Sequence, residues 1–451
     1  MTEAKEAGCY WWAEAPPQTS EDGRWSSQAD IAIIGCGFAG LSAAITLARA
    51  GRQVTIFEKE AIGFGASTRN GGITSGNIRY NRAQLAQRFG RAKADSFIDE
   101  AAAARATLYQ FIKREKIACD FQLHGRLVGM SKPFDKAAIE AENTAFTARY
   151  NIAPRLIETE ELQSYIGSSA YRAGLFRPDI GGIHPAKLLH EKRRLALAAG
   201  VTIHSPCAVK NITRKGAGFD IETSKGRIHA EHLISATNGY TDKAQPWLRK
   251  RLVPVISEII VTEKLGSNFV KSLMPKRSMF GEDKEVGFYY RPTPDGQRIL
   301  LGGRRMHKQD AVAQARLHQG LAGIFPELEG SKIEHYWAGN VVFPFDQMPK
   351  LAVHDGIIYP TGFCGSGTVW AHWLGRKAAL MILANPEINN ADEAADNPQA
   401  PASNFAGMAM RTLPFYSGKP WFMPLAMSYY RLRDRLAGGD IKPPPVPLFL
   451  F

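Results

Sequence analysis

Residues 30–58 contain a short apolar run, a glycine-rich turn, a helical pattern and a second apolar run, in that order. The runs 30–34 (DIAII) and 54–58 (VTIFE) are typical of buried parallel strands. Between them, apolar residues recur at helical spacing and would pack one helix face on a sheet; they are Leu41, Ala44, Ile45 and Ala48. Strand, helix and strand within about 30 residues predict a βαβ unit, and hence an α/β fold.

The turn at 35–40 reads GCGFAG, a GxGxxG motif placed directly between strand and helix. Gly35 allows the tight turn, Gly37 lets the backbone approach a pyrophosphate, and Gly40 lets helix and strand pack closely. Glu58 ends the second strand, where its carboxylate can accept both ribose hydroxyls and its charge disfavours a 2′-phosphate. The sequence therefore predicts a dinucleotide site at the positive end of the helix.

A second glycine-rich loop, GFGASTRNGG at 63–72, follows the βαβ unit. Such a loop can wrap a pyrophosphate and the edge of a flavin ring, with Arg69 countering the phosphate charge. Only one GxGxxG unit is present, whereas a flavoprotein that also bound a nicotinamide would normally have two. These features favour FAD over NAD.

The rest of the chain alternates between helical and strand patterns. Helices are expected near 84–118, 134–150 and 186–199, and a hairpin near 207–230. Alternating apolar and polar residues over 252–305, with a Pro-Asp-Gly turn at 294–296, suggest an antiparallel sheet. Together with the βαβ unit, these patterns predict an α/β chain that also contains an antiparallel sheet.

The loop 62–72 resembles that of the D-amino-acid oxidase-like (DAO) FAD enzymes, and most nearly their γ-glutamylputrescine oxidase-like branch. Further motifs that fit are GGIHP at 181–185, YYR at 289–291, WAGN at 337–340, MP at 348–349 and YYRLRDRL at 429–436. The resemblance implies a Rossmann-type FAD-binding domain made of 29–90, 171–240 and 333–387, interleaved with an antiparallel-sheet substrate domain made of 91–170 and 241–332. Residues 1–28 would form an N-terminal arm on the surface, and 388–451 a linker and C-terminal tail.

The resemblance also implies which residues contact FAD. Segments 35–40 and 58–59 would hold the ADP half, Val209 and 236–239 would pass the adenine side, and 362–368 would close over the flavin ring and offer N–H groups to it. The expected FAD-binding residues are Gly35, Gly37, Phe38, Ala39, Gly40, Glu58, Lys59, Gly65, Ala66, Ser67, Arg69, Asn70, Gly71, Gly72, Val209, Ala236, Thr237, Gly339, Gly362, Phe363, Gly365, Ser366, Gly367 and Thr368. We expect the FAD to be bound non-covalently, and no metal site.

Three positions depart from the family pattern. Relatives often carry Ser and His where this chain has Cys364 and Ser366, which puts the substrate in doubt. Sarcosine-oxidase-like relatives carry a lysine that assists reaction with oxygen, and Leu300 stands at the corresponding place. The electron acceptor is therefore open between oxygen and another molecule.

The implied chemistry is oxidation of an amine by hydride transfer to flavin N5, after which the imine hydrolyses to a carbonyl compound and an amine. A guanidinium at the end of the strand 299–303 would suit a substrate carboxylate. The candidate substrate residues are Tyr290, Arg304, Arg305, Trp370 and His372. A small anionic amine or amino acid is expected, such as iminodiacetate, sarcosine or a γ-glutamyl-polyamine.

The formal net charge of +13 is compatible with nucleic acid, a membrane surface or an anionic ligand. The basic residues form no long run, so no nucleic-acid partner is expected. A tRNA-modifying flavoenzyme remains an alternative, as does a membrane-associated amine dehydrogenase that passes electrons to quinone, with the aromatic and basic tail as a peripheral contact. Five scattered cysteines and the absence of an apolar signal segment predict a cytoplasmic protein, or one at the inner face of the membrane.

Overall fold

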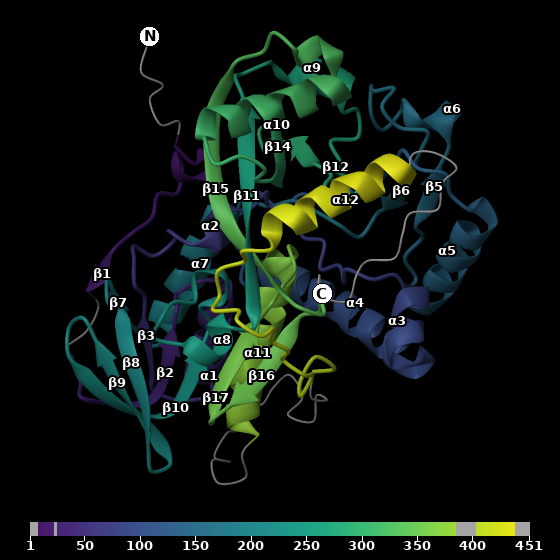
Figure 1. The fold of residues 1–451 in the computed structure, drawn as a ribbon. Helices are drawn as coiled ribbons and strands as arrows, with labels where there is room; N and C mark the ends of the chain where they lie inside the picture. The colour runs from purple at the N-terminus through teal and green to yellow at the C-terminus, as the bar shows by residue number, and fades with distance from the viewer. Residues whose placement is uncertain (1–7, 22–24, 385–402, 438–451) are drawn as a thin grey trace.

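The computed structural model describes residues 8–21, 25–384 and 403–437. Two β-sheets, each covered by helices, occupy the bottom and the top of the molecule in Figure 1. The predicted fold class, a Rossmann-type α/β domain combined with a largely antiparallel sheet, is confirmed.

The first sheet contains the predicted βαβ unit at its centre. Its main path runs β1-β7-β3-β2-β10-β17-β16, and the predicted hairpin, β8 and β9, joins it through β10. The strands from β7 to β17 are mutually parallel, and β1 and β16 pair antiparallel at the two ends. The bounds are β1 (Ser20–Glu21), β2 (Gln28–Ile34), β3 (Val54–Phe57), β7 (Thr202–Ser205), β8 (Val209–Lys215), β9 (Gly218–Thr223), β10 (Arg227–Ser235), β16 (Lys350–His354) and β17 (Ile357–Thr361).

The second sheet has the order β15-β11-β14-β13-β12-β4-β6-β5. All neighbours are antiparallel except β12 and β4. The turn predicted at 294–296 connects β13 to β14. The bounds are β4 (Arg126–Met130), β5 (Arg155–Ile157), β6 (Ala173–Arg177), β11 (Leu252–Thr262), β12 (Met279–Glu282), β13 (Tyr289–Pro292), β14 (Ile299–Arg304) and β15 (Ile333–Pro344).

The helices cover both sheets, and α1, α7 and α11 bury apolar faces against the first one. The helix expected over 84–118 is two helices, because Gly90 has a φ of +83° and ends α3 before α4 begins. The bounds are α1 (Phe38–Arg49), α2 (Ala66–Arg69), α3 (Arg82–Phe89), α4 (Arg91–Arg114), α5 (Lys136–Tyr150), α6 (Thr159–Leu162), α7 (Pro185–Ala198), α8 (Pro246–Arg249), α9 (Ser267–Leu273), α10 (Asp310–Ile324), α11 (Gly367–Leu383) and α12 (Met423–Ala437). Short 3₁₀ helices are η1 (Tyr10–Trp12), η2 (Asn238–Tyr240) and η3 (Pro326–Leu328).

The sheets divide the chain differently from the predicted domain boundaries. Strands β6 and β15 had been assigned to the FAD-binding domain, but β6 pairs with β4, and β15 pairs along the whole of β11 in the second sheet. Conversely, α4 had been assigned to the substrate domain, but its buried Phe97 and Leu108 belong to the core of the first sheet. Sequence periodicity identifies a strand but not the sheet that it joins, so the sheets do not follow the predicted boundaries.

The N-terminal arm does not merely lie on the surface, as had been expected. Trp11 is fully buried and packs with Ala186, Leu300 and Trp337 between the two sheets. An indole ring of this size stabilises the fold by removing a large apolar area from water. The arm is therefore part of the core.

The described part of the C-terminal tail docks on the body of the molecule. Phe405 joins the core of the first sheet, and Phe422 packs with Val253 and Phe345. Helix α12, yellow in Figure 1, then runs alongside the second sheet. The rest of the predicted linker and tail, 388–402 and 438–451, lies outside the described residues.

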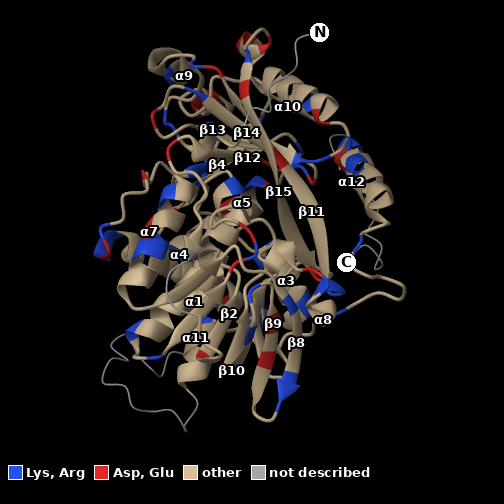
Figure 2. Cartoon of the chain, turned by 90° about the vertical axis from the view of Figure 1, so that its left-hand side faces the viewer, with Lys and Arg blue, Asp and Glu red and all other residues tan. Residues whose placement is uncertain are grey.

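The positions of Lys and Arg and those of Asp and Glu are interspersed along the helices and strands in Figure 2, without a single block of one sign. Within the described part of the chain, no helix is both long and apolar enough to cross a membrane.

Candidate functional site

A cavity of about 550 Å³ lies where the two sheets meet. Its floor is formed by the carboxyl ends of parallel strands, at Ile34 after β2, Glu58 after β3, Ala236 after β10 and Phe363 after β17. Its other walls come from the second sheet. The carboxyl edge of a parallel sheet is where α/β proteins bind ligands, and the volume is in the range of small-molecule sites.

The structure brings most of the predicted FAD-binding residues together around this cavity. Gly40, Gly72 and Gly362 are the exceptions. The predicted residues that line it are Gly35, Gly37, Phe38, Ala39, Glu58, Lys59, Gly65, Ala66, Ser67, Arg69, Asn70, Gly71, Val209, Ala236, Thr237, Gly339, Phe363, Gly365, Ser366, Gly367 and Thr368.

The three exceptions support the lining residues from behind. A Cβ on Gly40 would overlap the carbonyl oxygen of Gly35, which agrees with the close helix–strand packing predicted for it. Gly72 and Gly362 have φ values of +69° and +70°, a conformation that L side chains rarely adopt.

The beginning of α1 has the geometry of an anion site. The N–H of Cys36 donates to Glu58 Oε2 at 2.7 Å, and that of Phe38 to Ser67 Oγ at 3.0 Å. The remaining first-turn N–H groups have no partner within the helix, as at any helix N-terminus. A Cβ on Gly37 would lie 2.9 Å from Ser67 Oγ, so only glycine keeps this approach to the helix open. A pyrophosphate fits here.

Burial of the Glu58 carboxylate raises its pKa, while the N–H groups of Cys36, Glu60 and Lys59 oppose that rise. The side chain is held at the end of β3 and lines the cavity, where its oxygens can accept hydrogen bonds from hydroxyl groups.

The loop 66–72 is fixed from behind by two indoles. Trp11 Nε1 donates to the carbonyl oxygen of Asn70 at 2.8 Å, and Trp337 Nε1 to that of Arg69 at 3.0 Å. The Asn70 side chain accepts from the N–H of Gly72 at 2.8 Å. The guanidinium of Arg69, predicted to face phosphate, instead donates to the carbonyl oxygens of Phe64 and Ala338. Arg69 therefore ties this loop to β15 as well as lining the cavity.

The loop 362–368 leads into α11 and is held by a polar contact across the cavity. Asn238 Oδ1 accepts from the N–H of Gly362 at 2.9 Å and from Thr361 Oγ1 at 3.1 Å. Ser366, at the position where relatives often have histidine, lies 3.1 Å from Ser75 Oγ. Cys364 is held with a φ of +50°.

These observations fit the FAD expected from the sequence. Backbone glycines and a helix N-terminus lie at one end of the cavity, and a carboxylate that accepts hydrogen bonds lies beside them. The part of the cavity against the second sheet, which Tyr289, Arg304 and Phe343 help to line, is called the chamber below. The residues present could hold both the dinucleotide and the ring of FAD.

The chamber against the second sheet contains Arg304, at the end of β14. Among the described residues, its guanidinium has no carboxylate within ion-pair distance; its nearest rings are Phe343 and Tyr430, at 5.7 and 6.0 Å. Burial lowers the pKa of Arg304 to about 10, so the side chain stays cationic at neutral pH. The prediction that Arg304 faces a ligand is compatible with this placement.

Strand alternation turns two other predicted substrate residues away from the cavity. Tyr290 packs in the core of the second sheet, where its ring stacks on Phe280 and its hydroxyl donates to that of Tyr171 at 3.0 Å. Its neighbour Tyr289 lines the cavity in its place, with its hydroxyl 3.0 Å from Ser257 Oγ. Arg305 points outward and pairs with Asp310 and Glu258, at a distance of 3.3 Å for Glu258.

The helical period of α11 places the remaining two candidate substrate residues outside the cavity lining. Thr368 and Ala371 share the face of α11 that lines the cavity, whereas Trp370 and His372 lie to either side of it. Trp370 Nε1 donates to the carbonyl oxygen of Asn77, and the ring packs in the core. His372 Nδ1 lies 2.8 Å from Lys192 Nζ, and burial lowers the pKa of this imidazole well below its usual range. Neither Trp370 nor His372 lines the cavity.

Sequence reasoning missed two arginines of the chamber, Arg79 and Arg126. Arg79 follows the predicted flavin loop, and Arg126 begins a strand that was not assigned. Arg79 and Arg304 also line a smaller cavity of about 60 Å³ beneath α12, so the two cavities share a wall. No sequence motif marks either residue; only sheet topology brings them together.

Comparison with known proteins agrees with this geometry. The family model described as FAD dependent oxidoreductase (DAO) matches residues 30–381. Gamma-glutamylputrescine oxidoreductase of Escherichia coli (strain K12) is 30% identical over 412 residues, which are 90% of this chain and 93% of that protein. The crystal structure of glycine oxidase from Geobacillus kaustophilus has a TM-score of 0.65 at 18% identity, covering 78% of this chain and 93% of that one. Iminodiacetate oxidase from Chelativorans sp. BNC1 has a TM-score of 0.63 at 16% identity, covering 83% of this chain and 98% of that one.

Proposed function

The chain belongs to the FAD dependent oxidoreductase (DAO) family, and from this premise we propose that it oxidises a C–N bond of a small anionic amine or amino acid. Bound FAD supplies the hydride acceptor. The substrate loses a hydride from carbon and a proton from nitrogen, and water converts the resulting imine to a carbonyl compound and an amine. The relatives named for γ-glutamylputrescine, glycine and iminodiacetate support the substrate class.

One observation carries the anionic part of the proposal: the half-buried guanidinium of Arg304 lines the chamber with no carboxylate in ion-pair distance among the described residues. A buried cation without an anion is costly, and a substrate carboxylate bound bidentately would offset that cost. The carboxylate would also hold the amine in one orientation, which accelerates a reaction that needs positioning more than acid–base help.

The rest of the chamber supports this role. Tyr289 covers Gly302 on the neighbouring strand and closes the chamber near Gly71, while Val255 and Phe343 provide apolar walls. Burial raises the pKa of Tyr289 to about 12, so its hydroxyl stays protonated and able to donate. A chamber of this kind excludes water and favours the neutral form of an amine.

The direct test is an anaerobic screen of the FAD-loaded protein against secondary amines and amino acids, read as loss of the oxidised flavin absorbance. Bleaching by anionic amines and not by their neutral or cationic counterparts is expected. If no amine or amino acid bleaches the flavin, the proposed function is wrong.

The role of Arg304 is tested by Arg304→Met, which keeps the side-chain length. We expect the KM for an anionic amine to rise by about 10- to 100-fold, because one charged hydrogen-bonding group is lost. Arg305→Met is the matched control, because Arg305 is the next residue but does not line the cavity; melting temperature checks that it tolerates the loss of the ion pair with Glu258. Equal KM values for wild type and Arg304→Met would show that Arg304 does not bind the substrate carboxylate.

We also propose that FAD is held non-covalently. Three thiols line the cavity, those of Cys36, Cys207 and Cys364. Burial raises the pKa of Cys36 and of Cys364, which disfavours the thiolate that a covalent link requires. Acid precipitation should leave the flavin in the supernatant; yellow colour in the pellet would contradict this.

The electron acceptor separates an oxidase from a membrane-associated dehydrogenase. Trp421, Leu425 and Leu432, on and just before α12, expose much of their apolar surface, and Arg431 and Arg435 lie among them. This mixture favours an anionic bilayer surface as a second candidate partner.

Hydrogen peroxide formation in air would identify oxygen as the acceptor. Flotation with anionic but not neutral vesicles, lost in Trp421→Ser, would support the membrane alternative.

A further inference from the structure

Arg126 is a second, half-buried cation in the chamber. It begins β4 and lines the cavity. The Asn77 amide, turned so that its oxygen faces the guanidinium, accepts from Nη1 at 3.2 Å. Nε is sealed without a partner, and within the described part of the chain no carboxylate forms an ion pair with Arg126. Burial lowers the pKa of Arg126 to about 10, so it too remains charged at neutral pH.

The neighbourhood of Arg126 offers it no anion. Arg177, on the adjacent strand β6, directs its guanidinium to Asp179, with N–O distances of 2.8 and 2.9 Å. Arg105 also pairs with Asp179. An arginine that is buried, charged and left without a counter-ion is costly unless a ligand supplies the negative charge.

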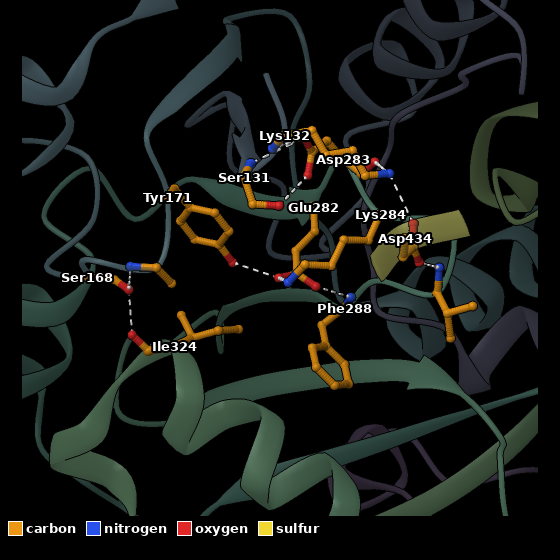
Figure 3. Close-up of polar contacts among 12 residues, drawn as sticks. Ser131, Lys132, Ser168, Tyr171, Glu282, Asp283, Lys284, Phe288, Ile324 and Asp434 are labelled. Carbon is orange, nitrogen blue, oxygen red and sulfur yellow. Dashed lines mark hydrogen bonds and ion pairs between the residues drawn. The ribbon is translucent and has the colours of Figure 1, made fainter. Parts of the chain in front are cut away.

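Glu282, the last residue of β12 beside β4, is an acid of the chamber, but its oxygens are occupied. Figure 3 shows them accepting from Lys284 Nζ at 2.8 Å, from the N–H of Phe288 at 2.8 Å and from the Tyr171 hydroxyl at 3.3 Å. A substrate ammonium would therefore have to displace Lys284. The charged side chains of the chamber that have no ion-pair partner among the described residues, Arg126 and Arg304, are both cationic.

The second sheet sets the spacing of Arg126 and Arg304. Arg126 lies on β4 and Arg304 on β14, with β12 and β13 between them. The guanidinium of Arg126 crosses Gly281 on β12, where a Cβ would overlap Nη2. Two strand spacings then separate it from β14, which is roughly 10 Å. Tyr289 stands between the two cations, beside Gly71 of the flavin loop.

We propose that Arg126 binds a second substrate carboxylate, and that the substrate is an amine flanked by two carboxylates, the class of N-carboxyalkyl amino acids. The proposal rests on the proposed function, because it assigns the second anchor of the same site. Arg304 binds one carboxylate and Arg126 binds the other, so that the C–N bond between them lies beside Tyr289. One short dicarboxylate satisfies both unpaired cations at once.

The test compares iminodiacetate, with two carboxylates, and sarcosine, with one, on the FAD-loaded enzyme. In wild type we expect iminodiacetate to bind about 10- to 100-fold more tightly than sarcosine, measured by anaerobic perturbation of the flavin spectrum. In Arg126→Met this preference should vanish, because iminodiacetate binding weakens by a much larger factor than sarcosine binding does. Arg126→Lys should restore part of it. Flavin content and melting temperature check that each variant is folded.

The outcomes separate the two proposals. If no amine reduces the flavin, the proposed function fails. If amines are oxidised but wild type binds iminodiacetate no more tightly than sarcosine, the second anchor is wrong and the proposed function stands. The wild-type comparison decides the matter even where Arg126→Met does not fold, and an unchanged preference in a folded Arg126→Met also overturns the assignment.

Discussion

At the scale of single residues, Gly40 shows how tightly the dinucleotide turn is packed. A side chain there meets the backbone of Gly35, which cannot move without displacing the turn. We expect Gly40→Ala to destabilise the protein by about 1–3 kcal/mol and to lower its flavin content. Flavin-to-protein absorbance and thermal melting measure both effects. Gly323→Ala, in α10 and with open space around it, is the matched control and should lose neither.

Lys192 gives the stability a pH dependence. It is fully buried on α7, donates to Ser42 Oγ at 2.7 Å and to His372 Nδ1 at 2.8 Å, and burial lowers its pKa from 10.5 to about 7. Between those values the unfolded chain binds more protons than the folded one, so the free energy of unfolding rises with pH. The slope from this group is about 1.4 kcal/mol per pH unit between pH 7.5 and 10.

Lys192→Met should remove that slope. The measurement is denaturant unfolding of both proteins at several pH values, and the difference between them isolates Lys192 from the other titrating groups. A pH-independent difference would mean that Lys192 is charged, or neutral, in both states.

At single positions, sequence reasoning succeeded where the backbone conformation or a close approach requires one residue type. Gly35 and Gly37 have one physical role each, and both line the cavity. It failed where the answer depends on which way a strand or helix faces. Tyr289 and Tyr290 differ only by one step of alternation, as do Arg304 and Arg305. Nothing in the local sequence says which member of each pair faces the chamber.

At the scale of elements, α12 fixes the loop 283–288, which lines the mouth of the chamber. The Asp434 carboxylate accepts from the N–H groups of Glu285 and Val286 at 2.8 and 2.9 Å. It also accepts from Lys132 Nζ at 3.0 Å (Figure 3). The helix thereby holds a loop that carries Lys284 and Phe288, both of which line the chamber.

Asp434→Ala should release this loop. We expect a loss of about 1–3 kcal/mol in stability, because buried N–H groups lose their acceptor, and a several-fold higher KM with a smaller change in kcat. Limited proteolysis should cut within 283–288. Arg435→Ala, an exposed position on the same helix, is the control. A KM equal to that of wild type would show that the loop does not depend on the helix.

The elements themselves were largely predictable, but their partners were not. The 3.6-residue period found α7 and α5, and the two-residue period found the strands between 252 and 305. The sheet that β6 and β15 join depends on long-range pairing with β4 and β11. Arg126 was missed for the same reason: its importance arises from the cavity, and only pairing between distant strands forms that cavity.

At the scale of the whole molecule, one cavity takes its walls from both sheets. FAD bound there contacts both, so it should stabilise the native chain as a single unit. At 100 times its dissociation constant, a ligand that binds only the folded state adds about 2.7 kcal/mol. We expect FAD to raise the melting temperature by several degrees and to merge any separate transitions of the FAD-free protein into one. Calorimetry with and without FAD measures this, and two unchanged transitions with flavin bound would contradict it.

The strand order of the first sheet also has a consequence for how the protein is made. The apolar strand β2 leaves the ribosome early, but its neighbour β10 comes nearly 200 residues later, and β17 lies still further on. At typical elongation rates, β2 waits on the order of ten seconds or more for its second partner. During that time a hydrophobic edge is open to association with other chains. The nascent chain should therefore depend on chaperones, and FAD can load only after the C-terminal third has been synthesised.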